Sequence, residues 1–278
     1  MTARTPEDLI AQGYRVNVLT YVGQGWQSFI NKPLGYLSFV WGCLLATLAA
    51  EFFLVFAAQS THNAFLSGLS QWAVYLLHPG AVLLIIAGTA TATWFEIQGV
   101  SLPFWGVFTS PIVVRRLVLC GVVAALLLQI YGVAIVWIVR LVGNLFNLNT
   151  ATLDVAAPII GALVAFLYPG VNWTLAPFLI LDRNLTAWAA ILVSWNVIAE
   201  GWWGMLALSL IFLLPVMLLW TVIFLLPIYP PVQGLLLLLS LGPFIALLGS
   251  SFSIAYADIF GLESKTLISA RHAPRNGS

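Results

Sequence analysis

Glu51 and Arg140 are charged side chains set in, or at the end of, long apolar stretches of the sequence. Glu51 lies about two helical turns inside the end of its stretch, and Arg140 closes another. A carboxylate surrounded by hydrocarbon is costly and is a candidate functional group by default. We predict a structural Glu51–Arg140 pair, or a protonated Glu51. A proton or ion relay is the alternative, but it needs a further carboxylate deeper in the stretch, and the sequence has none there.

His78 is a second candidate, because it precedes a Pro-Gly step in an apolar stretch. Its imidazole has the chemistry to ligate a metal or the magnesium of a chlorophyll, but a hydrogen bond to a neighbouring helix is the commoner role. The sequence contains no metal-spaced His or Cys pair, nucleophile elbow or phosphate-binding loop. Cys43 and Cys120 are predicted to act as small apolar residues. We therefore predict no catalytic residue, no metal and no resident cofactor, with a pigment or a lipid as open alternatives.

Tyr168, Pro169 and Gly170 interrupt the fourth apolar stretch near its middle. Pro and Gly release backbone groups that lipid cannot satisfy, so we expect this break to face protein or a wet cavity. Asn172 and Thr174, about one turn away, are the predicted local donors and acceptors. Broken helices of this kind supply ligand sites in some transporters, but a structural kink is commoner. Both interpretations stay open.

The composition indicates that membrane spans position these residues. The chain is 7% charged and 62% hydrophobic, with a mean hydropathy of +1.03, whereas ordinary globular domains are roughly 25% charged. The uncharged stretches exceed the ~20 residues that cross a bilayer. We predict an all-α, polytopic membrane protein with six transmembrane helices, at residues 36–58, 71–92, 117–142, 154–181, 203–228 and 232–257.

Two further segments are predicted to be amphipathic helices on the inner membrane surface. Val18, Val22, Trp26 and Phe29 recur at helical spacing before the first span. The second segment covers residues 185–199 and carries a similar stripe of Leu, Trp and Ala. We expect both segments to feed directly into a span.

Charge asymmetry predicts the topology. Nine of the ten Lys and Arg residues fall on one side of the six spans, and Arg140 alone falls on the other, so both termini are expected to be cytoplasmic. The predicted organisation is an N-terminal region with an interfacial helix (1–35), a six-helix membrane domain (36–258) and a cytoplasmic tail (259–278). The net charge is +1 and the cations are scattered along the chain, so the sequence gives no indication of a nucleic-acid partner.

Small residues four apart predict where helices approach each other closely, because lipid offers no hydrophobic drive for helix association. These residues are Ala46 and Ala50; Gly88 and Ala92; and Gly249, Ser253 and Ala257. Near the predicted inner ends of the spans, charged residues form either a solvated girdle or pairs that join Asp182 or Asp258 to Arg115 or Arg116.

Four motifs recur in a recognisable order. They are Gly25-Trp26-Gln27-Ser28-Phe29; Tyr168-Pro169-Gly170 leading into residues 175–183; residues 189–195 with Glu200-Gly201-Trp202; and Pro243-Phe244 ahead of residues 255–261. In these motifs the chain resembles a bacterial family of polytopic proteins similar to the membrane domain of glycerophosphodiester phosphodiesterase. The resemblance covers most of the chain and is clearest from residue 166 to 204. It implies a six-helix membrane module, sometimes fused to a catalytic domain, and it transfers architecture but no activity.

These observations favour a non-enzymatic structural or accessory subunit of a bacterial cytoplasmic or thylakoid-type membrane, packed against membrane lipid and other membrane protein subunits. One alternative is a small transporter or lipid-handling permease that uses the broken fourth span. A more distant alternative is a pigment-binding subunit of a photosynthetic complex, with His78 as the ligand.

Overall fold

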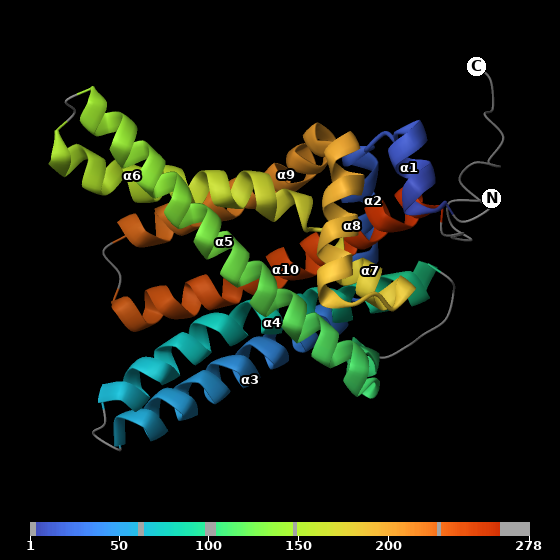
Figure 1. Ribbon diagram of the computed structural model, residues 1–278. Helices are drawn as coiled ribbons and strands as arrows, with labels where there is room; N and C mark the ends of the chain where they lie inside the picture. Colours follow the sequence, from blue (N-terminus) through green and yellow to red (C-terminus); the bar gives the residue numbers. More distant parts are fainter. Residues whose placement is uncertain (1–3, 61–63, 98–103, 147–148, 227–228, 262–278) are drawn as a thin grey trace.

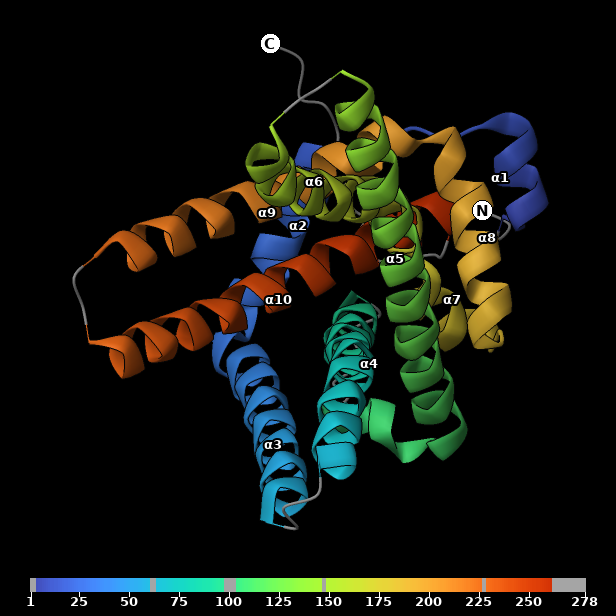
Figure 2. The same ribbon diagram turned by 60° about the vertical axis from the view of Figure 1, so that its left-hand side comes forward.

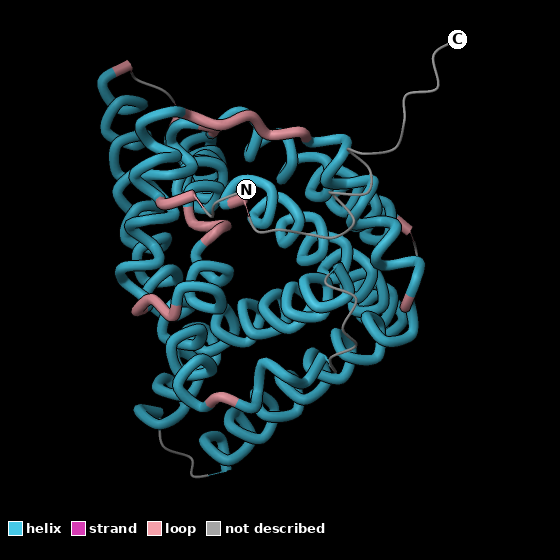
Figure 3. The backbone as a smooth tube through the Cα atoms, turned by 90° about the vertical axis from the view of Figure 1, so that its right-hand side faces the viewer, coloured by secondary structure: helices cyan, strands magenta, loops and turns pink. Residues whose placement is uncertain are grey.

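The computed structural model describes residues 4–60, 64–97, 104–146, 149–226 and 229–261. Every regular element in these ranges is a helix, and the described loops are short (Figures 1 and 3). In chain order the elements are α1 (Pro6–Gln12), α2 (Val18–Asn31), α3 (Pro33–Ser60), α4 (Ala64–Ile97), η1 (Phe104–Thr109), α5 (Pro111–Leu145), α6 (Thr150–Ala165), η2 (Phe166–Gly170), α7 (Ala176–Arg183), α8 (Ala187–Glu200), α9 (Trp202–Leu225) and α10 (Pro230–Phe260). Residues 262–278, most of the predicted tail, lie outside the described ranges.

Six segments are long and apolar enough to cross a membrane, so the chain is an all-α, multi-pass membrane protein as predicted. They are Pro33–Ser60, His78–Glu96, Pro111–Leu145, Thr150–Gly170, Trp202–Leu225 and Val232–Phe260. The segments on α3, α5 and α10 are longer than expected. In α4 the apolar segment begins only at His78, although the helix itself begins at Ala64.

The expected fourth span, residues 154–181, is wrong in its extent. The apolar helix ends at Gly170 after a single π turn, and α7 is a separate short helix. Pro169 has no N–H to donate, and Pro177 is well placed in the first turn of a new helix. The chain then bends by 119° between α7 and α8. Pro169 therefore closes the span instead of kinking its middle.

Three helical hairpins make up the membrane domain: α3 with α4, α5 with α6, and α9 with α10. The C-terminal ends of α3, α5 and α9 lie to the left in Figure 1 and diverge in Figure 2; we call this end of the molecule the tip end. At the opposite end, here called the terminal end, the amide of Arg4 donates to the carbonyl of Phe260 at 2.9 Å. The two ends of the described chain therefore lie on the same side of the hairpins.

The core lies at the terminal end, around the last third of α10. Residues 249–257 of this helix are all buried, and α2, α3, α4 and α9 pack against α10. Glycines allow the close approaches. A Cβ at Gly25 of α2 would meet the backbone of Ser251, one at Gly249 would meet Thr89, and one at Gly88 would meet the ring of Phe39. The predicted close packing at Gly88 and Gly249 is confirmed.

The two predicted amphipathic helices are present as α2 and α8, and in both of them the most deeply buried residues lie beside the predicted apolar stripe. In α2 the buried residues are Tyr21, Gly25 and Ser28, while Trp26 of the stripe is 51% exposed. In α8 the bundle covers Ala190, Ile191 and Ser194, whereas Trp188 and Leu192 are exposed. Val18, Val22 and Phe29 of the α2 stripe are partly buried against the core, so only Trp26 of that stripe is exposed. In Figure 1, α8 runs across the direction of α9 and α10.

Candidate functional site

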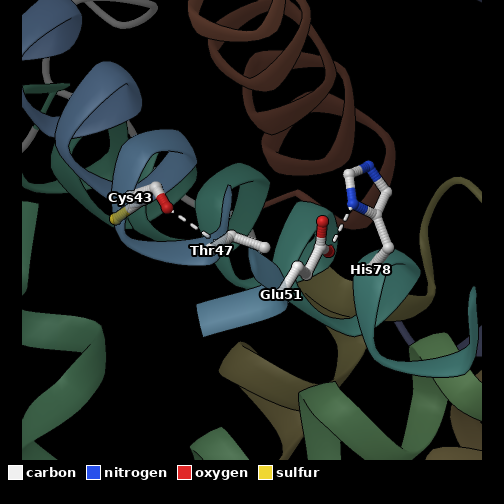
Figure 4. A network of polar contacts seen from close by, with 4 residues as sticks. All are labelled: Cys43, Thr47, Glu51 and His78. Atoms are coloured by element: carbon white, nitrogen blue, oxygen red, sulfur yellow. Dashed lines mark hydrogen bonds and ion pairs between the residues drawn. The ribbon is translucent and has the colours of Figure 1, made fainter. Parts of the chain in front are cut away.

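One face of α3 positions the candidate site. Cys43, Thr47 and Glu51 are spaced by four residues, so they stack along one side of the helix (Figure 4). The hydroxyl of Thr47 donates to the carbonyl of Cys43 at 2.8 Å. This bond uses the hydroxyl hydrogen of Thr47 within α3, so Thr47 does not donate to Glu51. Glu51 is the residue of the row nearest the tip end, and its carboxylate accepts hydrogen bonds from elsewhere.

Glu51 pairs with His78 of α4. Its Oε1 lies 2.9 Å from His78 Nδ1, and the two side chains point toward each other (Figure 4). The Glu51 side chain is 18% exposed and that of His78 is 49% exposed. The hydrogen-bonding role predicted for His78 is confirmed, since the bond crosses from one helix of the hairpin to the other.

The predicted Glu51–Arg140 pair is wrong. Arg140 donates instead to Asp154 Oδ1 at 2.9 Å, across the α5–α6 hairpin. The physical reason is proximity, because the hairpin turn brings Arg140 and Asp154 together, whereas Glu51 belongs to another hairpin. Both members of this pair are well exposed, which weakens their attraction.

A cavity of about 580 Å³ opens beside Glu51, between α3, α4, η1 and α5. Its volume falls in the ~300–1,000 Å³ range of small-molecule sites. The lining consists of Gly42, Cys43, Ala46, Thr47, Ala50, Glu51, Leu54, Val74, Ala81, Leu84, Ile85, Trp105, Phe108 and Val118. Among these described residues Glu51 carries the only charge, so the cavity is an apolar space with one carboxylate.

Small side chains on α3 account for the width of the cavity. Ala46 and Ala50, predicted to mark a close helix contact, line the cavity instead. Just beyond it, α4 and α5 cross so closely that a Cβ at Gly121 would fall within the backbone of Gly80. The crossing holds α4 and α5 together, while the alanines leave room beside α3.

The sequence did not single out the η1 residues of this site. Trp105 and Phe108 lie between two predicted spans, and apolar periodicity does not predict where a short connection will fold back. Trp105 and Phe108 both pack against Phe39 of α3, with ring centroids 5.0 and 6.4 Å from it. For the part of the cavity formed by α3, the four-residue spacing of Cys43, Thr47 and Glu51 was the sequence pattern that could have predicted the lining.

At the terminal end a chain of buried hydroxyls joins α2 to three spans. Ser28 donates to Glu96 Oε2 at 2.9 Å and lies 2.9 Å from the hydroxyl of Tyr36. That hydroxyl lies 2.8 Å from Thr93 Oγ1, which donates to Ser250 at 3.3 Å. Each of these groups has a protein partner, so we assign the chain a structural role in fixing α2 on α3, α4 and α10.

Tyrosines, and not the predicted Arg115 and Arg116, donate to Asp258 and Asp182 at the terminal end, and Arg183 Nε also lies 3.6 Å from Asp182 Oδ2. Tyr21 donates to Asp258 at 2.6 Å, and Tyr256 donates to Asp182 at 2.7 Å. Burial, together with the neighbouring Asp258, raises the pKa of Tyr21, so this phenol remains a donor at neutral pH. Arg116 instead donates to the backbone and side-chain oxygens of Asn184. The expected pairs of Asp182 or Asp258 with Arg115 or Arg116 are therefore wrong.

At the break after α6, Pro169 faces the protein interior as predicted, whereas Tyr168 is 46% exposed. Pro169 and Asn172 are buried, and the amide of Trp173 donates to the carbonyl of Pro169 at 3.1 Å. The hydroxyl of Thr174 donates to the carbonyl of Val171 at 2.8 Å, which confirms its predicted local role.

Ser194 of α8 bonds the backbone at the break, whereas Asn172 Oδ1 is buried without a hydrogen-bond partner among the described residues, so the local role predicted for the Asn172 side-chain oxygen is not seen. Its hydroxyl donates to the carbonyl of Asn172 at 2.7 Å and accepts from the amide of Leu175 at 3.2 Å. Tyr168 lies beside Trp195, with ring centroids 5.3 Å apart. These contacts account for the break as a structural turn, and they favour that interpretation over a ligand site at Tyr168, Gly170 and their neighbours.

The described residues contain no group of three His, Cys, Asp or Glu side chains that could hold a metal ion. The Glu51–His78 pair next to an apolar cavity is therefore the strongest candidate site, and its chemistry is binding by burial and hydrogen bonding. Comparison of the chain with models of known families, with curated proteins and with solved structures finds no match.

Proposed function

We propose that this chain is a non-enzymatic membrane protein that holds one lipophilic molecule, a lipid of the surrounding bilayer, in the cavity between α3, α4 and α5. The observation that carries the proposal is the cavity itself, about 580 Å³ in volume and lined almost wholly by apolar side chains. Burying apolar surface in such a space is favourable, at ~25 cal/mol per Å² for area removed from water, but less for a tail taken from lipid. The shape of the cavity and the polar group at its end must therefore supply the selectivity for one lipid over another.

The location of the cavity supports a lipid over a soluble ligand. All three of its helical walls are segments long and apolar enough to cross a membrane, so a molecule that enters sideways comes from the hydrocarbon layer. The lining runs from Gly42 to Leu54 on α3, about 18 Å at the rise of an α-helix. An elongated chain fits this space better than a compact polar metabolite does.

The proposal places the protein in a bacterial cytoplasmic or thylakoid-type membrane, with both termini cytoplasmic. The nine-to-one distribution of cations supports that orientation. The resemblance to the membrane domain associated with glycerophosphodiester phosphodiesterase remains a prediction. So does binding of a pigment by His78, whose Nδ1 is already engaged by Glu51.

Native mass spectrometry of the gently solubilised protein tests the proposal. We expect the wild-type protein to retain one lipid. Ala46→Trp, which fills the cavity from α3, should lose it. Leu48→Trp is the matched control, because Leu48 lies on the same helix, is 41% exposed and does not line the cavity. Loss of the lipid from Ala46→Trp alone would support the cavity as its site.

Two results would overturn the proposal. One is a wild-type protein without any bound lipid, and the other is equal retention of lipid by Ala46→Trp and Leu48→Trp. The same spectra address the accessory-subunit alternative. A second protein chain that remains bound in stoichiometric amount, with no lipid in the cavity, would favour that function.

A further inference from the structure

We infer that the polar end of the bound lipid is an uncharged or cationic hydrogen-bond donor, a hydroxyl or an amine, and that Glu51 selects it against anionic lipids. This inference rests on the proposed function and specifies the class of molecule that the cavity takes.

The charge of the lining gives the first argument. Glu51 is the one charged residue among the described lining residues, and its partner His78 stands outside the lining. Arg140, the cation that the sequence placed on this side of the membrane, is occupied by Asp154 on another hairpin. An anionic headgroup at this end of the cavity would therefore meet a carboxylate and no arginine or lysine. Juxtaposed like charges repel each other and so disfavour an anionic ligand here.

Hydrogen-bonding capacity gives the second argument. An ionised carboxylate only accepts hydrogen bonds and has about four lone-pair sites. His78 occupies one side of Oε1, and within the described chain no further donor is bonded to this carboxylate. Thr47 does not supply one, because its hydroxyl hydrogen is directed to the carbonyl of Cys43. The remaining acceptor sites of Glu51, which lines the cavity, suit a hydrogen-bond donor on the ligand.

The position of the pair along the helices gives the third argument. His78 begins the apolar part of α4 and Glu96 ends it. The 18 residue steps between them span about 27 Å, close to the ~30 Å hydrocarbon thickness of a bilayer. The Glu51–His78 pair thus lies at the tip-end limit of the apolar segment of α4, while α3 continues as an apolar helix for nine residues beyond Glu51, to Ser60. A lipid can place its polar end there and extend its tail along α3 toward Gly42, deeper in the membrane.

His78 acts as a positioning residue in this arrangement. Its ring is half exposed and contacts Oε1 from the side of α4, while Glu51 itself lines the cavity. The bond restricts the rotamers of a flexible carboxylate, so Oε2 is held ready to accept from the ligand. Replacing His78 with Gln keeps a side-chain donor, whereas replacing it with Leu removes the donor.

Delipidated protein and three probes with the same tail test the inference: hexadecanol, hexadecylamine and hexadecanoate. Binding is measured by native mass spectrometry at mildly alkaline pH, where the acid is ionised. We expect the alcohol and the amine to bind wild-type protein, and the acid to bind about tenfold more weakly or worse. Glu51→Gln should remove the discrimination against the acid and weaken the amine. Asp154→Asn, which removes a carboxylate on another hairpin, should change neither the discrimination against the acid nor the binding of the amine.

His78→Leu should weaken the binding of the alcohol and of the amine, and His78→Gln should restore much of that binding.

The outcomes separate this inference from the proposed function. If the acid binds wild-type protein as tightly as the alcohol, and Ala46→Trp blocks both, the cavity binds lipid but Glu51 does not select its polar end, and the inference fails. If no probe binds, or if Ala46→Trp binds all three as wild type does, the proposed function itself fails. Thermal unfolding of each variant verifies that loss of binding is not loss of fold.

Discussion

At the scale of single residues, carboxylates in this protein are held mainly by neutral donors. Glu96 is bonded by Ser28, Asp258 by Tyr21 and Asp182 by Tyr256. A neutral hydroxyl costs less to desolvate than a guanidinium does, so such a pair avoids part of the penalty of burying two opposite charges. Glu51 follows the same pattern with an imidazole at the tip end. Pairing Glu51 with the cation predicted on the same side of the membrane therefore gave the wrong partner, Arg140, in place of His78.

A double-mutant cycle on thermal stability tests the assignment of that partner. Glu51→Gln and His78→Leu should show a coupling of roughly 0.5 to 1 kcal/mol, at the low end for contacting residues because His78 is half exposed. Glu51→Gln and Arg140→Gln should be additive, since the two residues have different partners. Coupling in the second cycle and none in the first would restore the pair that the sequence predicted.

Ser194 offers a sharper test of the turn after α6 than its proline does. Ser194→Ala should leave two buried backbone groups, the carbonyl of Asn172 and the amide of Leu175, without a partner. We expect a loss of about 1 to 3 kcal/mol for each group that remains unsatisfied. Ser209→Ala is the matched control, because the hydroxyl of Ser209 is also buried but bonds only Met205 of its own helix. Equal melting temperatures of the two variants would show that Ser194 does not hold the turn.

At the scale of elements, glycines decide which helices touch and where space remains. The crossing of α4 and α5 at Gly80 and Gly121 brings the two backbones together, and the neighbouring Ala81 and Val118 then line the cavity. Close van der Waals packing holds these helices together, because lipid is as apolar as the helix surface and hydrophobic burial gives no driving force for their association. The position of the cavity therefore depends on that crossing.

Gly121→Ala should separate α4 from α5 and reduce stability by about 1 to 3 kcal/mol, the usual cost of overpacking. Gly132→Ala on the same helix is the control, because its Cβ would meet Ala165 Cβ at an ordinary 3.8 Å. Thermal unfolding in detergent compares the two. A Gly121→Ala protein as stable as Gly132→Ala would contradict the close crossing.

At the scale of the whole molecule, three hairpins project from a shared core at the terminal end. Both described chain ends lie at that core, joined by the Arg4–Phe260 hydrogen bond (Figure 1). An even number of crossings follows, and the cation distribution predicts that these ends are cytoplasmic. The test positions Asn63 and Asn147, which the sequence suggests for the hairpin turns, lie outside the described residues.

Cysteine labelling in intact cells tests this topology. A membrane-impermeant reagent should label Ser60→Cys and Asn149→Cys, which are exposed at the tip end, and should leave Glu7→Cys unlabelled until the membrane is opened. Cys43 and Cys120 are buried and provide little background. Labelling of Glu7→Cys alone would invert the orientation, and labelling of all three would contradict a single topology.

The sequence by itself determined the fold class, the number of spans, and most of their positions. These follow from the length and apolarity of single segments, which are local properties set by bilayer thickness. It also identified Glu51, His78 and the break at Pro169 as special, because polar groups and prolines are conspicuous in apolar stretches. The tertiary structure alone decided what these residues contact. Pairing Glu51 with His78, closing the fourth span at Gly170, and leaving a cavity at Ala46 and Ala50 all depend on how hairpins pack. That packing is a sum of small, non-local contacts between residues far apart in the chain, and no periodicity within one segment encodes it.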